Sequence, residues 1–511
     1  MPIARTHSVS LLGLRGAVVE IEADLSNQLP NFVLIGLPDT ALGEAKDRVR
    51  AAIGNAGLDL PSRRLTVNLS PAALPKHGSG FDLGIALAVL ACAEAVAAES
   101  IDRVVHLGEL GLDGRLRPID GVLPAVMAAQ RAGFTTVMVP TGNADEASLV
   151  PGIRVVAVAS LREAAIWHGA KLKPELVEPI LRVADEPPRS DLDLADVIGN
   201  GDAIEALIAA AAGGHHVFML GPPGAGKTML AARLPGLLPD LDAERALEVS
   251  SVRSLAGLPV GSALVTRPPF EAPHHSASTA ALIGGGSGVI RPGAAARAAH
   301  GVLFLDEAPE FPSTVLDALR QPLESGVITI HRARSVAHYP GSFQLVMAAN
   351  PCPCGQYGAR DSECTCPPVQ RRRYLARISG PLLDRVDIQL RVHRITTAHL
   401  RMSDAEAGVT STATARARVV AARSRAAHRL ATTPWSLNSQ VPGAWLRGPE
   451  ARLAAETTAV LDRALERGGI TMRGYDRVLR LAWTLADLDE TAIPDATHIG
   501  RALYLRKAMT T

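Results

Sequence analysis

An eight-residue phosphate-binding motif constrains the fold of this chain more than any other feature. Residues 221–228 read Gly-Pro-Pro-Gly-Ala-Gly-Lys-Thr and match the pattern G-x-x-x-x-G-K-[ST] at every position. An apolar run precedes the motif at 216–220, and 229–238 has helical character. Glycines at these positions let the backbone N–H groups and the start of the helix face phosphate oxygens. The motif therefore predicts a buried strand, a loop and a helix in a nucleotide-binding α/β unit.

Two residues of the motif are expected to act on the bound nucleotide. In loops of this kind Lys227 would reach the β and γ phosphates, and Thr228 would supply a hydroxyl to Mg²⁺. ATP and Mg²⁺ are thus the expected ligands. The predicted nucleotide-binding residues in the motif are Gly221, Pro222, Pro223, Gly224, Ala225, Gly226, Lys227 and Thr228.

An apolar run that ends in two acids lies downstream of the motif. Val302 to Leu305 is typical of a buried parallel strand, and Asp306 and Glu307 follow it directly. One of the two carboxylates can hold Mg²⁺ through water, and the other can polarise the attacking water as a general base.

Two further polar residues are candidates for the same site. Asn350 ends an apolar run that begins at Gln344, so its amide could orient the water beside the γ phosphate. The alternative is a turn residue that ends a strand. Arg385 could enter the site of a neighbouring subunit and neutralise charge in the transition state, or it could form a surface ion pair.

The charge of the chain is balanced overall but not along its length. It has 52 basic and 51 acidic residues among 511, a formal net charge of +1. From Gln370 onward, 23 residues are basic and 13 are acidic. This excess could attract nucleic acid, or it could complement an acidic surface of a neighbouring subunit.

The sequence contains no segment typical of a leader or a membrane span. Residues 1–25 lack a basic start followed by an apolar stretch, and the most apolar run, Ile85 to Ala98, is interrupted by Glu94. We therefore expect a cytoplasmic protein without membrane contact. Its five cysteines are then more typical of thiols or metal ligands than of disulfides.

Composition divides the chain into predicted domains. Residues 1–170 alternate β-rich runs with helical stretches, including a helix from Leu83 to Ala98, and predict an α/β domain. Residues 171–196 are polar and rich in proline, as in a linker. A second α/β domain is predicted for 197–395, and 396–511 has the spacing of a helical domain.

Four cysteines gather in a predicted insertion at 352–366 that is rich in proline, glycine and charged residues. The predicted ligands are Cys352, Cys354, Cys364 and Cys366. Four thiolates suit tetrahedral Zn²⁺, whose binding can order such a loop. The alternative is a loop of free thiols. Cys92 is expected in the core, and the adjacent His274 and His275 are better explained by an inserted helix or loop than as ligands.

A basic hairpin is predicted just before the Asn350 strand. Residues 326–338 alternate apolar and polar positions on both sides of an Arg-Ala-Arg-Ser centre. Arg332 and Arg334 near its tip could grip DNA phosphates without reading the base sequence. The alternative is an exposed hairpin with solvated charges. Residues 371–373 and a predicted helix at 416–429 are further candidates, although a solvated face explains the latter equally well.

Several segments together resemble the magnesium-chelatase-like AAA+ ATPases of the ComM/YifB type, over nearly the whole chain. They are 221–228, 273–278, 291–293, 301–310, 350–355 and 378–385. The resemblance implies an α/β multidomain fold with an S5/Lon-protease-like N-terminal domain, an AAA+ P-loop αβα core and a C-terminal helical lid. It also implies a homo-hexameric, ATP-driven DNA helicase that promotes branch migration during homologous recombination in natural transformation.

The resemblance assigns Lys227 and Thr228 to the Walker A motif, and Asp306 and Glu307 to Walker B. Asp306 and Thr228 would then hold Mg²⁺, and Glu307 would be the general base. In the wider group that includes the minichromosome-maintenance helicases, a hairpin similar to 326–338 lines the central pore.

Three further positions match functional residues of the family. Asn350 corresponds to sensor 1, and Arg385 occupies the position of the arginine finger. Arg473 corresponds to sensor 2, which would contact the γ phosphate. Without the resemblance, an arginine on a helix surface would be the better interpretation. Asn200 departs from the Gly-Gln that the family usually has, which weakens any assignment of contacts on the adenine side.

The N-terminal domain resembles Lon-type peptidases without their catalytic pair. Those enzymes use a serine activated by a lysine. The position of the serine falls on Asp82 and that of the lysine on Ala125. Ser79 could be a shifted nucleophile, but the sequence shows no base paired with it. A platform for DNA contact or for assembly is the better interpretation.

Two other functions compete with a DNA motor. A chelatase motor that inserts Mg²⁺ or Co²⁺ into a tetrapyrrole is the first, although motor subunits of that kind lack a leading domain and a four-cysteine insertion. A non-enzymatic ATP-binding scaffold is the second, and it would require a damaged site, which the sequence does not show.

Overall fold

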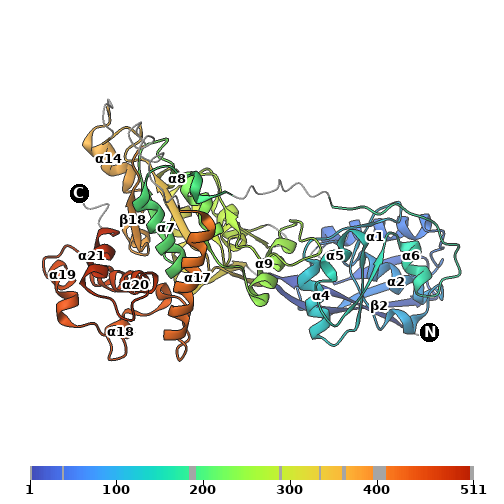
Figure 1. The fold of residues 1–511 in the computed structure, drawn as a ribbon. Helices are drawn as coiled ribbons and strands as arrows, with labels where there is room; N and C mark the ends of the chain where they lie inside the picture. The colour runs from blue at the N-terminus through green and yellow to red at the C-terminus, as the bar shows by residue number, and fades with distance from the viewer. Residues whose placement is uncertain are drawn as a thin grey trace.

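The computed structural model describes residues 3–36, 39–76, 78–182, 192–286, 290–332, 335–358, 364–394 and 410–506. The architecture is mixed α/β, as predicted. In Figure 1 a first sheet with its helices lies at one end of an elongated molecule. A second sheet lies in the middle, and the last helices of the chain lie at the other end.

The first sheet has seven strands in the order β3-β4-β2-β1-β5-β8-β9. Their bounds are β1 Ala4–Leu12, β2 Arg15–Ser26, β3 Asn31–Ile35, β4 Arg64–Ser70, β5 Val105–His106, β8 Thr136–Pro140 and β9 Arg154–Val158. Strand β2 is antiparallel to β1 and β4, and the other pairs are parallel. Helices α1 (Asp39–Asn55), α2 (Asp82–Cys92) and α6 (Leu161–Trp167) contribute to one apolar core, and α4 (Val122–Arg131) contributes to another.

The helix predicted for Leu83 to Ala98 is shorter than expected, because α2 ends at Cys92. Glu94 adopts a left-handed conformation with φ of 60°. The N–H of Ala95 then bonds to the carbonyl of Leu90 at 2.9 Å, which closes the last turn.

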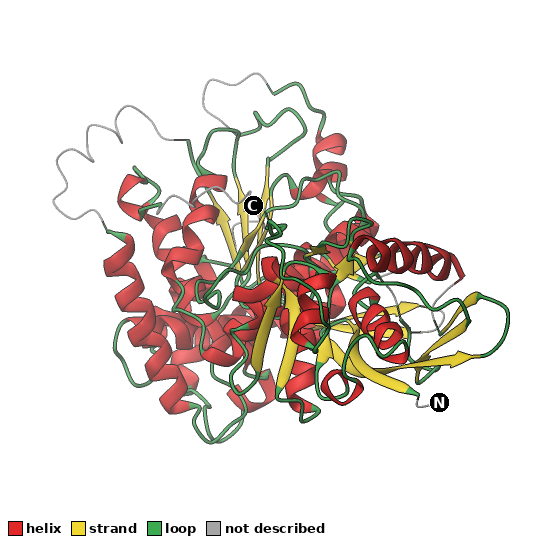
Figure 2. Ribbon diagram, turned by 90° about the vertical axis from the view of Figure 1, so that its right-hand side faces the viewer, coloured by secondary structure: helices red, strands yellow, loops and turns green. Residues whose placement is uncertain are grey.

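The second sheet has five parallel strands in the order β11-β14-β17-β10-β18. Their bounds are β10 Val217–Leu220, β11 Phe270–Glu271, β14 Val302–Leu305, β17 Gln344–Ala349 and β18 Ile388–Arg391. Strands β14 and β17 are buried along their whole length, as parallel strands covered on both faces must be. Figure 2 shows helices beside these strands. Helices α7 (Gly201–Gly213) and α8 (Lys227–Leu237) share one core with the sheet, and α9 (Ala243–Leu255) and α11 (Ala294–Arg297) share another.

The predicted hairpin is confirmed by two strands beside the second sheet. Strand β15 (Val327–Arg332) pairs antiparallel with β16 (Ser335–Pro340), and Arg332 lies opposite Ser335. Arg334 is outside the described residues. A second ribbon, β12 (Gly284–Gly285) with β13 (Arg291–Pro292), follows the short helix α10 (Thr279–Ile283).

The end of the chain is helical in its described part. Its helices are α17 Thr412–Arg429, α18 Gly443–Leu446, α19 Ala455–Glu466, α20 Met472–Leu488 and α21 Ala496–Tyr504. Helix α17 packs on α7 and α8, and α20 packs on α7, α17 and α21, so these helices share a core with the second sheet. Among the described residues, no helix has both the length and the apolar character that a membrane crossing requires.

Candidate nucleotide site

The phosphate-binding loop follows β10 at the carboxyl edge of the second sheet. Gly224 and Gly226 have φ of +74° and +90°, left-handed conformations that favour glycine, and helix α8 begins at Lys227. The Lys227 side chain is buried, and its Nζ donates to the carbonyl of Gly221 at 2.6 Å and to Asn350 Oδ1 at 3.0 Å. Burial lowers the pKa of Lys227. The lysine therefore lies where the loop would surround a phosphate.

Parallel register brings the predicted polar residues to this same edge. Leu220 lies opposite Ala349, so the loop and Asn350 leave adjacent strands side by side. Thr228 Oγ1 donates to Asp306 Oδ2 at 2.7 Å. A hydroxyl and a carboxylate are oxygen ligands of the kind that Mg²⁺ prefers, so this pair fits the expected ion.

Glu307 lies at the same edge, but its side chain contacts His275. Its backbone is left-handed, with φ of 49°, and its side chain is exposed. One carboxylate oxygen lies 3.2 Å from Nδ1 of His275. From its sequence context, His275 was expected only as part of an insertion. The one sequence signal for a contact between His275 and the site was the adjacent pair His274 and His275 close to a predicted strand.

Arg385 and Arg473 lie at the opposite edge of the sheet. Strand β18 is parallel to β10, and Ile388 lies opposite Val217, so Arg385 precedes the amino end of its strand. Four residues of β10 separate this edge from the phosphate-binding loop, a span of about 13 Å at 3.3 Å per residue. The structure thus brings Lys227 together with Asn350 but does not bring either arginine to them within one chain.

A pocket of about 660 Å³ at this amino edge is rich in arginine. The arginines that line it are Arg245, Arg385, Arg423, Arg473, Arg477 and Arg480. Arg385 donates to the carbonyl of Pro381 at 2.6 Å and forms an ion pair with Glu324. Burial, and then the charges of Arg320, Arg473 and Arg477, lower the pKa of Arg385. Four acidic residues line the same pocket and offset part of this positive charge: Asp240, Glu324, Asp384 and Asp387.

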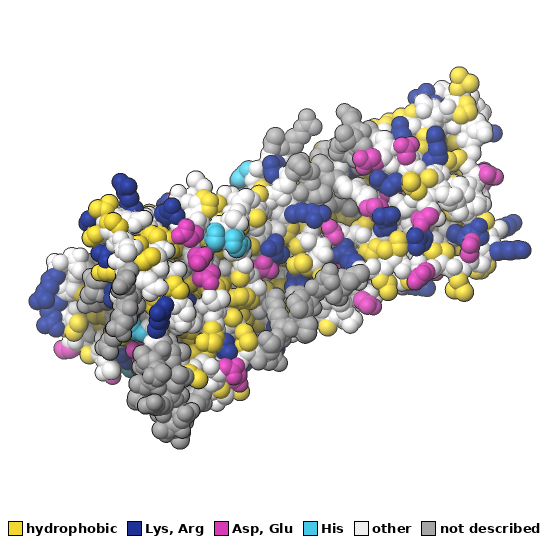
Figure 3. Space-filling model, turned by 90° about the horizontal axis from the view of Figure 1, so that it is seen from above, with side chains coloured by type: hydrophobic (Ala, Val, Ile, Leu, Met, Phe, Trp, Pro, Cys, Tyr) yellow, Lys and Arg dark blue, Asp and Glu magenta, His cyan; other side chains and the backbone are white. Residues whose placement is uncertain are grey.

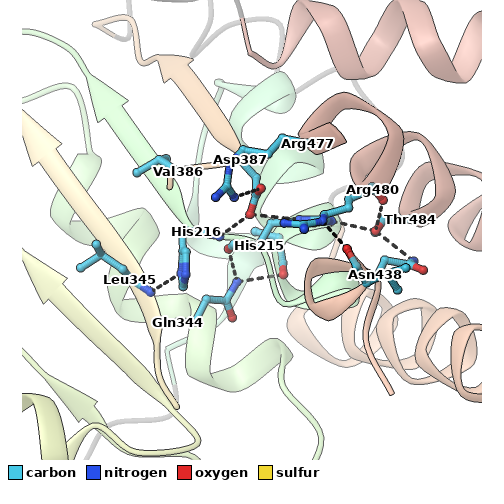
Figure 4. Close-up of polar contacts among 12 residues, drawn as sticks. His215, His216, Gln344, Leu345, Val386, Asp387, Asn438, Arg477, Arg480 and Thr484 are labelled. Atoms are coloured by element: carbon cyan, nitrogen blue, oxygen red, sulfur yellow. Dashed lines mark hydrogen bonds and ion pairs between the residues drawn. The ribbon is translucent and has the colours of Figure 1, made fainter. Parts of the chain in front are cut away.

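A buried polar network joins this edge to the helical end of the chain (Figure 4). Arg477 of α20 donates to Asp387 at 2.5 Å, and His215 Nδ1 lies 3.3 Å from the same carboxylate. His215 Nε2 is 2.7 Å from Thr484 Oγ1, also on α20. Burial alone would raise the pKa of Asp387, but the charge of Arg477 and the contacts with His215 and His216 together hold that pKa well below its usual range.

The four predicted cysteine ligands lie together. Their Sγ atoms are all within 4.8 Å of one another, and the Cys352–Cys354, Cys352–Cys364 and Cys354–Cys364 distances are 3.3, 3.7 and 3.7 Å. Four sulfurs at 2.3 Å from a tetrahedral Zn²⁺ would be about 3.8 Å apart, so the cluster fits this ion. A Cβ on Gly355 would lie 2.6 Å from the ring of Pro223, so this loop packs directly on the phosphate-binding loop.

The residues at the Lon-like positions lie on or beside helices α2 and α4, next to the first sheet. Arg48 donates to Asp82 at 2.7 and 3.2 Å, while burial raises the pKa of Asp82 to about 6. Ser79 forms a hydrogen bond with Glu109, and Ala125 is buried.

Asn200 forms two hydrogen bonds with the backbone of His393. Its side chain donates to the carbonyl of His393 at 3.1 Å and accepts from the N–H of the same residue at 3.2 Å. Its φ of 53° is in a region that asparagine tolerates better than glutamine.

Comparison with known proteins identifies the family. The model described as magnesium chelatase, subunit ChlI, matches residues 193–400, and related models match 21–143 and 409–506. Competence protein ComM of Haemophilus influenzae is 40% identical, over 99% of this chain and 98% of its own. The chain belongs to the ComM/YifB group of the magnesium-chelatase family. YifB of Escherichia coli is 39% identical, over 99% of this chain and 97% of its own.

Two further proteins are similar to the chain, one over nearly its whole length and one over part of it. An uncharacterized protein of Mycobacterium tuberculosis is 48% identical to the chain, over 99% of both. A Lon protease of Mycolicibacterium smegmatis is 31% identical over 176 residues, 32% of this chain and 22% of its own length. By family, the chain is an AAA+ ATPase, and the cluster around Lys227 is the candidate for its ATP site.

Proposed function

We propose that the chain is an ATP-driven DNA motor that works in the cytoplasm as a ring of identical subunits, with a hexamer as the expected form. One observation carries the proposal of a ring. The cluster of Lys227, Thr228 and Asp306 lies at one edge of the sheet, and Arg385 and Arg473 lie at the other. A site with both halves then needs two copies of the chain, and a closed ring supplies such a pair at every interface.

In this proposal the hydrolytic groups divide between two subunits. Lys227 binds the phosphates, Glu307 accepts a proton from the attacking water, and Asn350 orients that water. Mg²⁺, held by Thr228 and Asp306, would neutralise phosphate charge. Arg385 and Arg473 of the neighbouring subunit would contact the γ phosphate and stabilise the charge that develops during transfer.

The basic hairpin supports DNA as the polymer on which the motor acts. Arg332 is exposed at the end of β15 beside the hairpin tip, where its charge can reach a phosphate backbone. ComM of Haemophilus influenzae is named as a competence protein. Branch migration of single-stranded or branched DNA during recombination is therefore the activity that we propose.

We expect Arg332→Ala to weaken DNA binding by about tenfold and to lower the salt dependence of log Kd by about 1 for each phosphate that is no longer neutralised. Fluorescence anisotropy with labelled branched DNA at several salt concentrations measures both. Arg463→Ala on α19 is the matched control, since it removes an arginine remote from the hairpin. Unchanged affinity in Arg332→Ala would contradict the hairpin assignment. ATP turnover that no DNA alters, together with metal insertion into a porphyrin, would favour a chelatase motor instead.

We also propose that the four-cysteine cluster holds Zn²⁺ and thereby orders the loop that packs on Pro223. Purified protein should contain about one zinc ion per chain, measured with a chromogenic chelator after denaturation. Cys364→Ser/Cys366→Ser should lose that zinc and weaken ATP binding. Cys92→Ser is the control, because the Cys92 thiol bonds to the carbonyl of Ala23 in the first sheet. A chain without zinc that also binds none on titration would refute the assignment.

A further inference from the structure

The turn between β1 and β2 contacts the basic hairpin directly. Gly13 lies in this turn with φ of +62°, and a Cβ added to it would lie 2.8 Å from the backbone oxygen of His338 on β16. Its neighbours Leu11, Leu12 and Leu14 pack on the core to which β15 and β16 contribute. Figure 1 shows strands of the first sheet reaching toward α9 in the middle of the molecule. The first sheet therefore contacts the hairpin that is proposed to bind DNA.

The turn is held in place by helices behind it. The N–H of Gly121, at the start of α4, donates to the carbonyl of Ser254 on α9 at 3.0 Å. The N–H of Leu123 donates to the hydroxyl of Ser254 at 3.3 Å. A Cβ on Gly121 would lie 2.6 Å from the side chain of Leu11, so α4 also packs closely on the strand that leads into the turn. The turn, α4 and α9 thus form one continuous interface.

A second contact from the first sheet and its helices reaches the hairpin through the β12–β13 ribbon. Asp120, which directly precedes the start of α4, forms ion pairs with Arg291 of β13 at 3.2 Å and with Arg182 at 2.8 Å. Arg291 lies opposite Gly285 of β12, and a Cβ on Gly285 would lie 3.4 Å from Nη2 of Arg332. The carboxylate of Asp120 therefore ties down the ribbon that lies against this arginine.

The surface around the first sheet is less suited to DNA than the hairpin is. Figure 3 shows basic and acidic side chains interspersed over the end of the molecule that holds the first sheet, on the face seen from above. A phosphate backbone is attracted by clustered positive charge. By contrast, Arg332 is exposed at the end of β15. We therefore expect the first sheet to affect DNA binding through the hairpin.

We propose that the first sheet and its helices brace the basic hairpin, and that Gly13 and Asp120 are positioning residues for the DNA contact of Arg332. The β1–β2 turn supports β16 at His338, which pairs with Thr329 of β15, three residues before Arg332. Asp120 holds the β12–β13 ribbon beside the same arginine. The inference rests on the proposed function, because that function supplies the DNA contact.

Gly13→Ala should weaken the brace, because the added Cβ meets a backbone oxygen. The Kd for labelled branched DNA, measured by fluorescence anisotropy, should rise by about three- to tenfold, and by no more than in Arg332→Ala. The KM for ATP should stay at the wild-type value. Gly133→Ala is the matched control. Its φ is +92°, so the backbone strain is similar, but apart from its chain neighbours no atom of the described residues lies within 4 Å of the added Cβ.

Asp120→Asn tests the second contact without a change in the turn. It removes the charge that pairs with Arg291 and Arg182, and should raise the Kd for DNA by about two- to fivefold, as expected for partly exposed ion pairs. Asp113→Asn is its matched control, because Asp113 pairs with Arg115 at 2.6 Å in the same part of the chain. A rise in Kd as large in Asp113→Asn as in Asp120→Asn would argue against the role of the ribbon contact.

A double-mutant cycle shows whether the turn acts through Arg332. In the Arg332→Ala background, Gly13→Ala should cause no further loss of affinity, since the contact that the turn supports is already gone. An equal loss in both backgrounds would overturn the inference, because the turn would then affect DNA binding by another route. A Kd for DNA in Gly13→Ala that matches that of Gly133→Ala would overturn it as well.

Hydrogen exchange of the full-length protein tests the brace without DNA. The backbone N–H groups of β15 and β16, followed by mass spectrometry, should exchange about two- to tenfold faster in Gly13→Ala than in Gly133→Ala. Equal exchange in the two variants would overturn the inference. If Arg332→Ala leaves DNA binding unchanged, the proposed function loses its DNA contact, while faster exchange in Gly13→Ala would still support a braced hairpin.

Discussion

Glu307→Gln should lower ATP turnover by a factor of about 10² to 10⁴, because the amide cannot accept the proton of the attacking water. Glutamine keeps the shape of glutamate, and Lys227 and Thr228 remain in place to bind the nucleotide. The steady-state rate of ATP hydrolysis should therefore fall, while the equilibrium Kd for ATP stays close to the wild-type value.

Glu310→Gln provides the matched control for this change. Glu310 lies three residues further on and pairs with Arg377 at 3.3 Å, away from the Lys227 cluster. Its substitution should leave turnover nearly unchanged. Turnover in Glu307→Gln within a factor of two of the wild type would remove Glu307 from the role of base.

Arg385→Ala should lower turnover by about 10³, since an arginine finger of this kind typically supplies at least that much. The structure makes this expectation specific to assembled protein. Arg385 and Lys227 lie at opposite edges of one sheet, so in the proposed ring the loss would act on the site of the adjacent copy.

Mixing Arg385→Ala with Lys227→Ala tests that division directly. Each variant alone should be nearly inactive. In mixed rings some interfaces join an intact loop from one variant to an intact Arg385 from the other, so turnover should partly return. No recovery in mixtures shown to co-assemble would mean that each chain forms its site alone.

Much of the candidate site could be predicted from sequence because its residues end parallel strands. The loop after Leu220, the acids after Leu305 and Asn350 after Ala349 all meet at one edge. That geometry follows from strand direction alone. The register that places Asn350 beside Lys227 then follows from the pairing of β10 with β17.

Other features depended on contacts that no local pattern encodes. The early end of α2 at Cys92 depends on a left-handed Glu94, where the apolar run alone predicted a longer helix. The pairing of His275 with Glu307 joins residues from separate segments. The edge at which Arg473 lies depends on how α20 packs against the second sheet, which helical spacing cannot specify.

The Asp387 network has a mechanical consequence for a ring. Asp387 lies two residues after Arg385, and it is bonded to Arg477, which lies one turn along α20 from Arg473. The segment that carries Arg385 is thereby tied to the helix that carries Arg473. In the proposed ring, a tilt of the terminal helices would move the guanidinium groups of Arg385 and Arg473 together relative to the site of the neighbouring subunit.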